Sequence, residues 1–165
     1  MIYLCRHGET DYNRERRIQG RFETALNALG ERQAGAMGDL LHRLIGHDAD
    51  TPWRIVASPQ RRAKMTAEII ASRLGRAVEF DPRLVEVSVG AWEGLFYADI
   101  AKDDPTFLTD REWFFRSPGG ETYEDVMARV RAWLLEQEAE SHRRLIVVSH
   151  GVAGRLLRGA YAGLS

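Results

Sequence analysis

Two stretches of the sequence place a histidine and a glycine at the end of an apolar run: "CRHGE" at residues 5–9 and "VSHGV" at residues 148–152. In each stretch the glycine lets the backbone turn steeply and approach a ligand. Histidine changes its charge near neutral pH and serves as a nucleophile or a proton carrier. A single histidine at a strand end is more often structural, but the repeat predicts that His7 and His150 face each other across one crevice.

A third stretch, "SPQRRAKMTAE" at residues 58–68, supplies Arg61 and Arg62 in the first turn of a predicted helix, where free backbone N–H groups also favour an anion. Adjacent helical side chains diverge, so we expect one arginine to point inward; a solvated surface pair is the alternative. Together with Arg6 and the two histidines, the inward arginine predicts a cationic pocket suited to the three equatorial oxygens of a phosphoryl group. A metal would compete for the histidines, but no carboxylates stand at ligand spacing, and the arginines would repel a cation. We therefore expect neither a metal site nor a cofactor.

Three short apolar runs are typical of strands that are buried on both faces. They lie at residues 2–5, 53–58 and 144–149. Between them, apolar residues recur at helical spacing. The stripes are Ala34, Met37, Leu41 and Leu44; Ala63, Ala67, Ile70 and Leu74; and Tyr123, Val126, Val130 and Trp133. This alternation predicts an α/β fold of three layers, α/β/α, with a mostly parallel central sheet covered by helices on both faces, whose ligands bind beyond the carboxyl ends of the strands.

Two helix starts carry local signals. Ser58 followed by Pro59 predicts an N-cap and a first helical residue, and Thr122 with Asp125 three residues later resembles a capping box. One long connection, residues 101–120, separates elements; such connections are usually functional lids or disordered segments.

Composition limits the class of protein. With 165 residues, 44% hydrophobic and 28% charged, the chain fits one domain that builds its core without disulfides. Its net charge of -1, from 23 basic and 24 acidic residues, provides no basic field for nucleic acid. A single cysteine, Cys5, excludes an internal disulfide framework. Because neither a signal peptide nor an apolar run of membrane-spanning length is present, we expect a cytoplasmic protein without membrane contact.

The ordered motifs of the chain resemble the histidine phosphatase superfamily, also called phosphoglycerate-mutase-like. They are "RHGET" with Asn13, "SPxxRAxxTAE" at 58–68, "LVEVSVGAWEG" at 84–94, "PGGET" at 118–122 and "VVSHG" at 147–151. The resemblance spans residues 3 to about 158 and implies a single domain over residues 1–165. It further implies a metal-independent phosphatase that hydrolyses a small-molecule phosphomonoester.

The resemblance also implies a role for individual residues. His7 would attack phosphorus and become a phosphohistidine, while Glu86 would protonate the leaving oxygen. The residues that would hold the phosphoryl group are Arg6, Gly8, Asn13, Arg62, His150 and Gly151. The chemistry fits these types, because guanidinium groups keep His7 unprotonated and offset charge that develops on the phosphoryl oxygens. A general acid needs a carboxyl held protonated near neutral pH, for which partial burial is one means; a surface strand residue is the alternative for Glu86.

Departures from the mutase pattern favour the phosphatase branch. Typical phosphoglycerate mutases have a Trp-Asn pair after RHGES and a glutamate followed by Arg-His-Tyr-Gly. This chain instead has Asp11-Tyr12-Asn13 and Glu86-Val87-Ser88-Val89-Gly90. The alternatives are a mutase-type phosphoryl transferase, a non-catalytic phosphate-binding or protein-interaction module on the same fold, and a phosphatase of phosphoproteins that would need an open groove.

Residues 96–118, here called the lid segment, are rich in aromatic side chains, and in the family this region lies over the active site. The side chains are Phe96, Tyr97, Phe107, Trp113, Phe114 and Phe115, with Arg111 and Arg116 nearby. We expect them to favour an organic phosphate with an apolar or ring-bearing portion; the alternative is that the rings only anchor the loop. Relatives usually continue into another strand after the last helix, so the C-terminal edge element of the family is expected to be missing, and an exposed sheet edge could support a homodimer.

Overall fold

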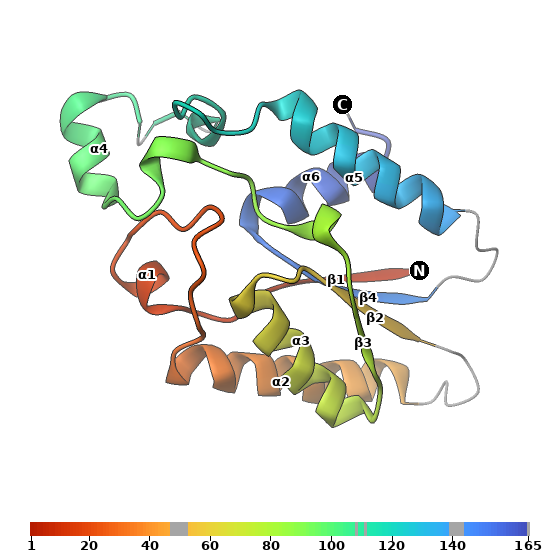
Figure 1. Ribbon diagram of the computed structural model, residues 1–165. Helices are drawn as coiled ribbons and strands as arrows, with labels where there is room; N and C mark the ends of the chain where they lie inside the picture. Colours follow the sequence, from red (N-terminus) through yellow and green to blue (C-terminus); the bar gives the residue numbers. More distant parts are fainter. Residues whose placement is uncertain (47–52, 108, 111, 139–143, 165) are drawn as a thin grey trace.

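The computed structural model describes residues 1–46, 53–107, 109–110, 112–138 and 144–164 and confirms the expected fold class (Figure 1). Four parallel strands form one sheet in the order β1-β4-β2-β3. They are β1 (Ile2–Arg6), β2 (Arg54–Ala57), β3 (Val78–Phe80) and β4 (Leu145–Ser149). The predicted runs correspond to β1, β2 and β4, whereas β3 was missed because it has only three residues, of which Glu79 and Phe80 are exposed.

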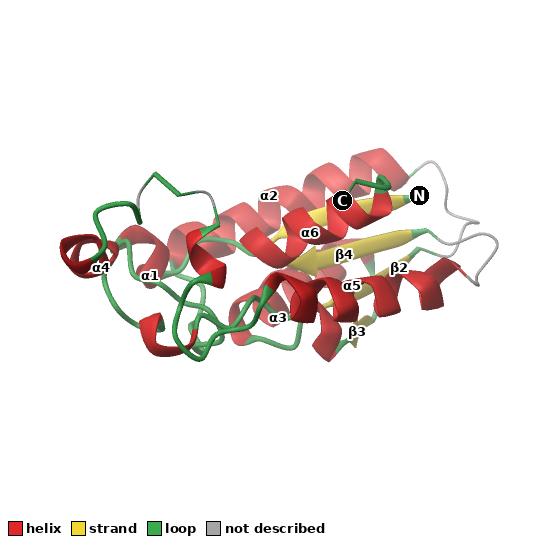
Figure 2. Cartoon of the chain, turned by 90° about the horizontal axis from the view of Figure 1, so that it is seen from above, coloured by secondary structure: helices red, strands yellow, loops and turns green. Residues whose placement is uncertain are grey.

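Helices cover both faces of this sheet, with α2 and α3 on one side and α5 and α6 on the other (Figures 1 and 2). The helices are α1 (Asp11–Arg14), α2 (Ala28–Ile45), α3 (Arg61–Leu74), α4 (Tyr97–Asp103), α5 (Tyr123–Glu138) and α6 (Gly151–Tyr161). Short 3-10 turns lie at Pro82–Leu84, Gly90–Trp92 and Trp113–Phe115. In the described part of the chain, no helix is long and apolar enough to cross a membrane.

The core consists of two apolar clusters, one on each face of the sheet. Successive strand residues alternate between them, as the strand period of two requires: Ile146 packs with the α2 and α3 cluster, and Val147 packs with the α5 and α6 cluster. All five residues of β4 are buried because this strand lies between β1 and β2. One predicted core position is wrong: Leu44 is 51% exposed, whereas Leu41 and Ile45 face the sheet.

The start of α3 differs from the sequence expectation. The helix begins at Arg61 with Gln60 as its N-cap, not at Ser58 and Pro59. The physical reason is that the Ser58 N–H donates to the Val148 carbonyl at 2.9 Å, which keeps Ser58 in the extension of β2. Ser58 is fully buried, and its hydroxyl oxygen accepts the Gln60 N–H at 3.3 Å.

The capping box before α5 is confirmed. The Thr122 N–H donates to Asp125 Oδ2 at 2.9 Å, and the Asp125 N–H donates to the Thr122 hydroxyl at 3.2 Å. Two free N–H groups at the helix start are thereby satisfied by reciprocal side-chain contacts.

The chain before the lid segment is held against the chain at and after its end. The Glu121 N–H donates to the Ser88 carbonyl at 2.9 Å. Gly90 has φ +44° and packs so closely on the Pro118–Gly120 backbone that a Cβ there would lie 2.2 Å from the Pro118 carbonyl oxygen. Only glycine fits this contact, so Gly90 closes the base of the lid segment.

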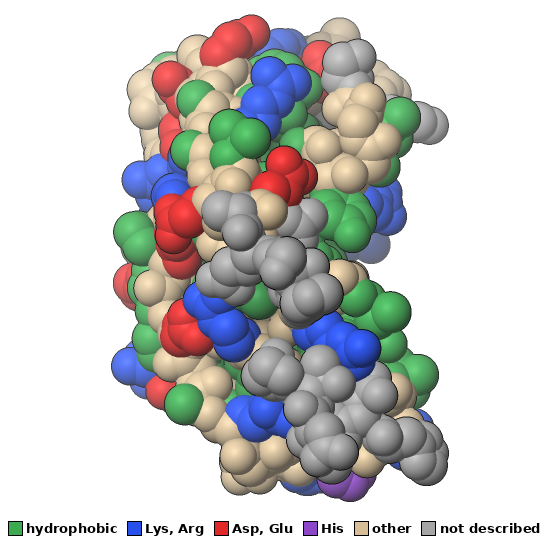
Figure 3. All heavy atoms as spheres, turned by 90° about the vertical axis from the view of Figure 1, so that its right-hand side faces the viewer, with side chains coloured by type: hydrophobic (Ala, Val, Ile, Leu, Met, Phe, Trp, Pro, Cys, Tyr) green, Lys and Arg blue, Asp and Glu red, His purple; other side chains and the backbone are tan. Residues whose placement is uncertain are grey.

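The surface at the amino ends of the strands, opposite the sheet edge that carries the histidines, shows basic and acidic side chains side by side (Figure 3). Among the described residues, no group of three or more histidine, cysteine or acidic side chains is arranged to hold a metal ion.

Candidate active site

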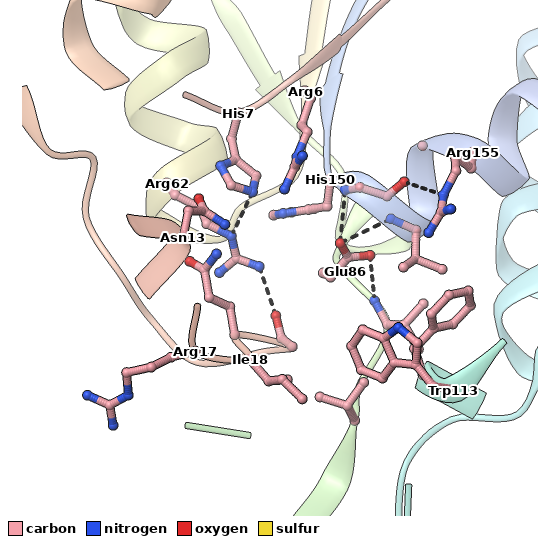
Figure 4. A pocket seen from close by; sticks show the side chains of 18 of the residues that line it. Arg6, His7, Asn13, Arg17, Ile18, Arg62, Glu86, Trp113, His150 and Arg155 are labelled. Atoms are coloured by element: carbon pink, nitrogen blue, oxygen red, sulfur yellow. Dashed lines mark hydrogen bonds between the residues drawn. The ribbon is translucent and has the colours of Figure 1, made fainter. Parts of the chain in front are cut away.

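The parallel register of β1 and β4 brings the two histidines together. Arg6 pairs with Ser149 in the ladder, so the residues that follow, His7 and His150, leave the sheet side by side. Their ring centroids are 5.2 Å apart, and both side chains are buried, with 7% and 2% exposed. Figure 4 shows Arg6, Arg62 and Asn13 around the same space.

His7 is a neutral imidazole whose proton position is set by the backbone. Its Nδ1 lies 2.7 Å from the Gly8 carbonyl oxygen, an acceptor, so Nδ1 carries the proton. Its Nε2 then accepts from the Arg62 Nε–H at 3.2 Å. Burial, followed by the Arg62 charge, lowers the pKa of His7 to about 3. The ring therefore presents the Nε2 lone pair at neutral pH.

Arg62 is the inward arginine of the expected pair and is only 1% exposed. Its two terminal nitrogens donate to the Gly20 and Phe22 carbonyls at 2.8 and 2.9 Å. Burial lowers its pKa to about 10, so it stays charged at neutral pH. Arg61 points outward, and its N–H donates to Glu23 at 2.8 Å. The first N–H of α3 is therefore capped by a carboxylate, contrary to the expectation that it is free for a ligand.

His150 is oriented by a residue for which the sequence suggested another role. Its Nε2 lies 2.8 Å from the Ser58 hydroxyl oxygen, which also accepts the Gln60 N–H at 3.3 Å. Because the described residues offer the Ser58 hydroxyl no other acceptor, we assign its proton to His150 Nε2, and the ring proton then lies on Nδ1. Nδ1 is buried and has no hydrogen-bond partner in the described ranges. Burial and then Arg62 hold the pKa of His150 well below its usual value.

Asn13 is oriented by the capping box of α1. Its Oδ1 accepts the Thr10 N–H at 3.2 Å, and the Thr10 hydroxyl accepts the Asn13 N–H at 3.2 Å. Thr10 is fully buried, and its hydroxyl also donates to Gln19 Oε1 at 2.9 Å. Because Oδ1 is occupied, the Asn13 amide can offer its Nδ2–H groups to a ligand in the cavity that it lines.

Glu86 lies beside the histidines as an N-terminal cap of α6. One carboxylate oxygen accepts the N–H groups of Gly151 and Val152 at 2.9 and 3.2 Å. The other accepts those of Ala153 and Val87 at 2.9 and 3.0 Å. The first N–H groups of a helix lack partners within the helix and attract negative charge. The four N–H donors hold the Glu86 carboxyl against the start of α6.

Two glycine N–H groups expected to bind phosphate already have partners. The Gly151 N–H donates to Glu86, and the Gly8 N–H donates to the Thr66 hydroxyl at 3.1 Å. Gly8 instead serves a packing need, since a Cβ there would lie 2.3 Å from the Gly30 carbonyl oxygen.

A cavity of about 640 Å³ extends from the histidines toward the lid segment, which contributes Tyr97, Trp113 and Phe114 to its lining. Phe107 is 1% exposed and packs edge-on against Tyr97, so this ring anchors the segment. The aromatic residues thus divide between lining and anchoring. Arg116 pairs with acidic residues inside the segment, whereas Arg111 lies outside the described residues.

Gln60 is a further structural link that sequence reasoning missed. Its Nε2 donates to the Gly20 carbonyl at 3.2 Å, and its Oε1 accepts the Glu86 N–H at 2.7 Å. It therefore ties the loop that holds Arg62 to the segment that holds Glu86. Its place inside the "SPxxR" motif was the only signal in the sequence.

The sequence profile of the histidine phosphatase superfamily (branch 1) matches residues 2–165. This chain belongs to that superfamily.

Known proteins similar to this member of the superfamily include phosphatases and a probable mutase. The chain is 41% identical over 134 residues to a bifunctional protein of Mycobacterium tuberculosis, covering 79% of this chain and 35% of that protein. It is 37% identical over 168 residues to a probable phosphoglycerate mutase of Salmonella paratyphi B, covering 99% and 75%. It thus spans about a third of the mycobacterial relative.

Among solved structures, a mycobacterial glucosyl-3-phosphoglycerate phosphatase in complex with VO3 superposes with a TM-score of 0.84 at 36% identity, covering 98% of this chain and 80% of that one. The same phosphatase has also been solved with inorganic phosphate.

Proposed function

We propose that this protein is a metal-independent phosphatase that hydrolyses a small organic phosphomonoester through a phosphohistidine on His7. The observation that carries the proposal is the buried neutral His7, whose Nε2 lone pair faces Arg62 and lies beside His150. Phosphatases among the similar structures support it, as do the vanadate and phosphate bound by one of them.

In the first step, His7 Nε2 attacks phosphorus, the N–P bond forms and the ester P–O bond breaks. Arg6 and Arg62 donate to the phosphoryl oxygens, and Asn13 adds its amide N–H. The Nδ1–H of His150 is buried in the free protein, so it donates once the ring turns toward the phosphoryl group. The Arg62 Nε–H must leave His7 Nε2 for a phosphoryl oxygen, which frees the lone pair as substrate enters.

Glu86 supplies the proton that the leaving oxygen needs. Because four N–H groups surround its carboxylate, Glu86 must take up a proton and turn away from α6 before it donates. This movement releases the Gly151 N–H, which can then donate to a phosphoryl oxygen. In the second step, Glu86 removes a proton from water, the oxygen attacks phosphorus, and phosphate leaves with His7 restored.

The experiment measures hydrolysis of p-nitrophenyl phosphate in chelator by the wild type, His7→Ala and Arg62→Ala, with Arg61→Ala as the matched outward control. We expect chelator-resistant turnover, loss of at least about 1,000-fold in His7→Ala, and an unchanged rate in Arg61→Ala. Acid-quenched samples should contain an acid-labile phosphoenzyme that is absent from His7→Ala.

Turnover that persists in His7→Ala, or that disappears in chelator, would contradict the proposal. A second candidate, a mutase-type transferase, is favoured by the Salmonella relative. It would move the phosphoryl group between positions of phosphoglycerate without releasing phosphate. Phosphate binding with neither reaction would indicate a binding module.

A further inference from the structure

The charged side chains that line the cavity are strongly unbalanced. They are Arg6, Arg17, Arg62, Arg155 and Arg158 on the positive side and Glu86 alone on the negative side. The whole chain has a net charge of only -1, so this concentration of arginine is a local feature. A single phosphoryl group does not need five guanidinium groups.

Two of these arginines are held by the protein itself. Arg62 donates to backbone carbonyls and to His7, and Arg17 donates twice to the Gly94 carbonyl while stacking on Tyr12. Arg6 lies next to His7 and is assigned to the phosphoryl group. The remaining pair, Arg155 and Arg158, has no role in the proposed reaction.

Arg155 and Arg158 lie three residues apart on α6 and therefore on one face of the helix. Both are exposed, and neither forms an ion pair with a carboxylate in the ranges that the structure describes. Other arginines do form such pairs, including Arg83, Arg116 and Arg129. The cavity arginines of α6 are thus left available for an anion from outside.

Contacts with the protein hold only part of the Arg155 guanidinium group. Its Nε donates to the Gly151 carbonyl at 3.3 Å, and its guanidinium lies over the Phe114 ring, 5.4 Å from the centroid. Its terminal nitrogens have no acceptor in the described part of the chain. Such a group is oriented in advance, so it binds an anion with little further loss of side-chain entropy.

Figure 4 places Arg155 on the same side of the cavity as Glu86 and Trp113, away from Arg62. Glu86 is the group that would protonate the leaving oxygen, so the leaving group extends toward this side. A cavity of about 640 Å³ has room for an organic leaving group beyond the phosphoryl site.

We propose that Arg155, with Arg158 one turn farther along α6, binds a second anionic group, a carboxylate or a phosphate, on the leaving-group portion of the substrate, while the body of that portion rests on Trp113. The inference rests on the proposed phosphatase function and narrows its substrate class to phosphomonoesters with a second negative charge. Arg155 is then a specificity-determining residue.

The test compares kcat/KM for three phenyl phosphates that differ at the para position: carboxymethyl, phosphonomethyl and the neutral, similarly shaped carbamoylmethyl. We expect the wild type to prefer at least one anionic ester over the neutral ester by about tenfold, as a charge-assisted contact provides. The anionic ester with the higher kcat/KM shows whether the second group is a carboxylate or a phosphate. Arg155→Ala should abolish the preference and leave the neutral ester unchanged, and Arg155→Lys should keep part of it.

Arg131→Ala is the matched control, because Arg131 is an exposed arginine of α5 outside the cavity lining. It should keep the full preference. Equal rates for charged and neutral esters in the wild type would overturn the inference while the phosphatase function stands. An equal loss for all three esters in Arg155→Ala would also overturn it.

If the wild type hydrolyses none of the esters, the proposed function fails. Calorimetric titration with the same esters then still tests whether Arg155 binds a second anionic group. Tighter binding of an anionic ester that is lost in Arg155→Ala supports it, and equal affinity for charged and neutral esters overturns it.

Discussion

The two central histidines are both buried and neutral, but different partners place their protons. The Gly8 carbonyl sets the proton of His7 on Nδ1, so Nε2 is the nucleophilic atom. The Ser58 hydroxyl sets the proton of His150, so Nδ1 is a donor. In the proposed reaction two identical side chains thus take different parts, a nucleophile and an oxyanion donor, because their neighbours differ.

Replacing Ser58 tests this assignment. In Ser58→Ala, His150 Nε2 loses its donor and the imidazole proton can move to Nε2, so the donor to the phosphoryl oxygen is weakened. We expect kcat/KM for p-nitrophenyl phosphate to fall by about 10- to 100-fold. Ser58→Thr keeps the hydroxyl and should restore most of the activity. Full activity in Ser58→Ala, measured on protein with a native circular dichroism spectrum, would contradict the assignment.

Sequence patterns identified the histidines and the arginine that the structure brings together, but not the residues that orient them. His7, Arg62 and His150 stand in motifs at predicted strand ends, and parallel strands bring such ends together. The contact of Ser58 with His150 joins positions 92 residues apart. No local sequence pattern predicts this contact, and a serine that precedes a proline is more often interpreted as a helix N-cap.

At the scale of the elements, the position of the lid segment depends most on Gly90. Its base closes where Gly90, with a positive φ, packs on the Pro118 carbonyl. The aromatic side chains of the lid segment that line the cavity are therefore held in place in two ways. One is the backbone contact of Gly90, and the other is the packing of Phe107. The sequence did not predict strand β3, because this strand is short and partly exposed. The start of α3 was predicted too early, because Ser58 remains hydrogen-bonded in the extension of β2.

Gly90→Ala should separate the base of the lid segment. The added methyl would strain the backbone and collide with the Pro118 carbonyl oxygen, so we expect the free energy of unfolding to fall by about 2–4 kcal/mol. Proteolysis within residues 96–118 should accelerate. Gly119→Ala is the control: its φ is +73°, but a Cβ there meets nothing within 4 Å, so its loss should be near 1 kcal/mol. Equal losses from the two variants, in urea unfolding, would show that the collision is unimportant.

For the whole molecule, the buried histidines link folding to pH. The pKa of His7 is 6.5 when unperturbed and about 3 in the folded chain. Between these values the unfolded chain binds more protons, so the free energy of unfolding falls as the pH falls through this range and is unaffected by His7 above it. His150 acts in the same direction.

Urea unfolding at pH 6.5 and 4.5 measures this linkage. The contribution of His7 to the loss of stability over that interval should be about 2 kcal/mol. His7→Ala should therefore lose less stability than the wild type on acidification, by about that amount. His42→Ala, which removes an exposed histidine of α2, should behave like the wild type. Identical acid losses in wild type and His7→Ala would show that His7 is not buried as a neutral group.

The strand order also has a consequence for synthesis on the ribosome. β1 emerges first, yet its neighbour in the described sheet is β4, which begins at Leu145. At typical translation speeds the nascent chain carries β1 without that partner for roughly 10–30 s. During this interval the apolar strand is a target for chaperones, and His7 has no His150 to face. The proposed nucleophile is therefore synthesised well before the histidine that it faces in the folded chain.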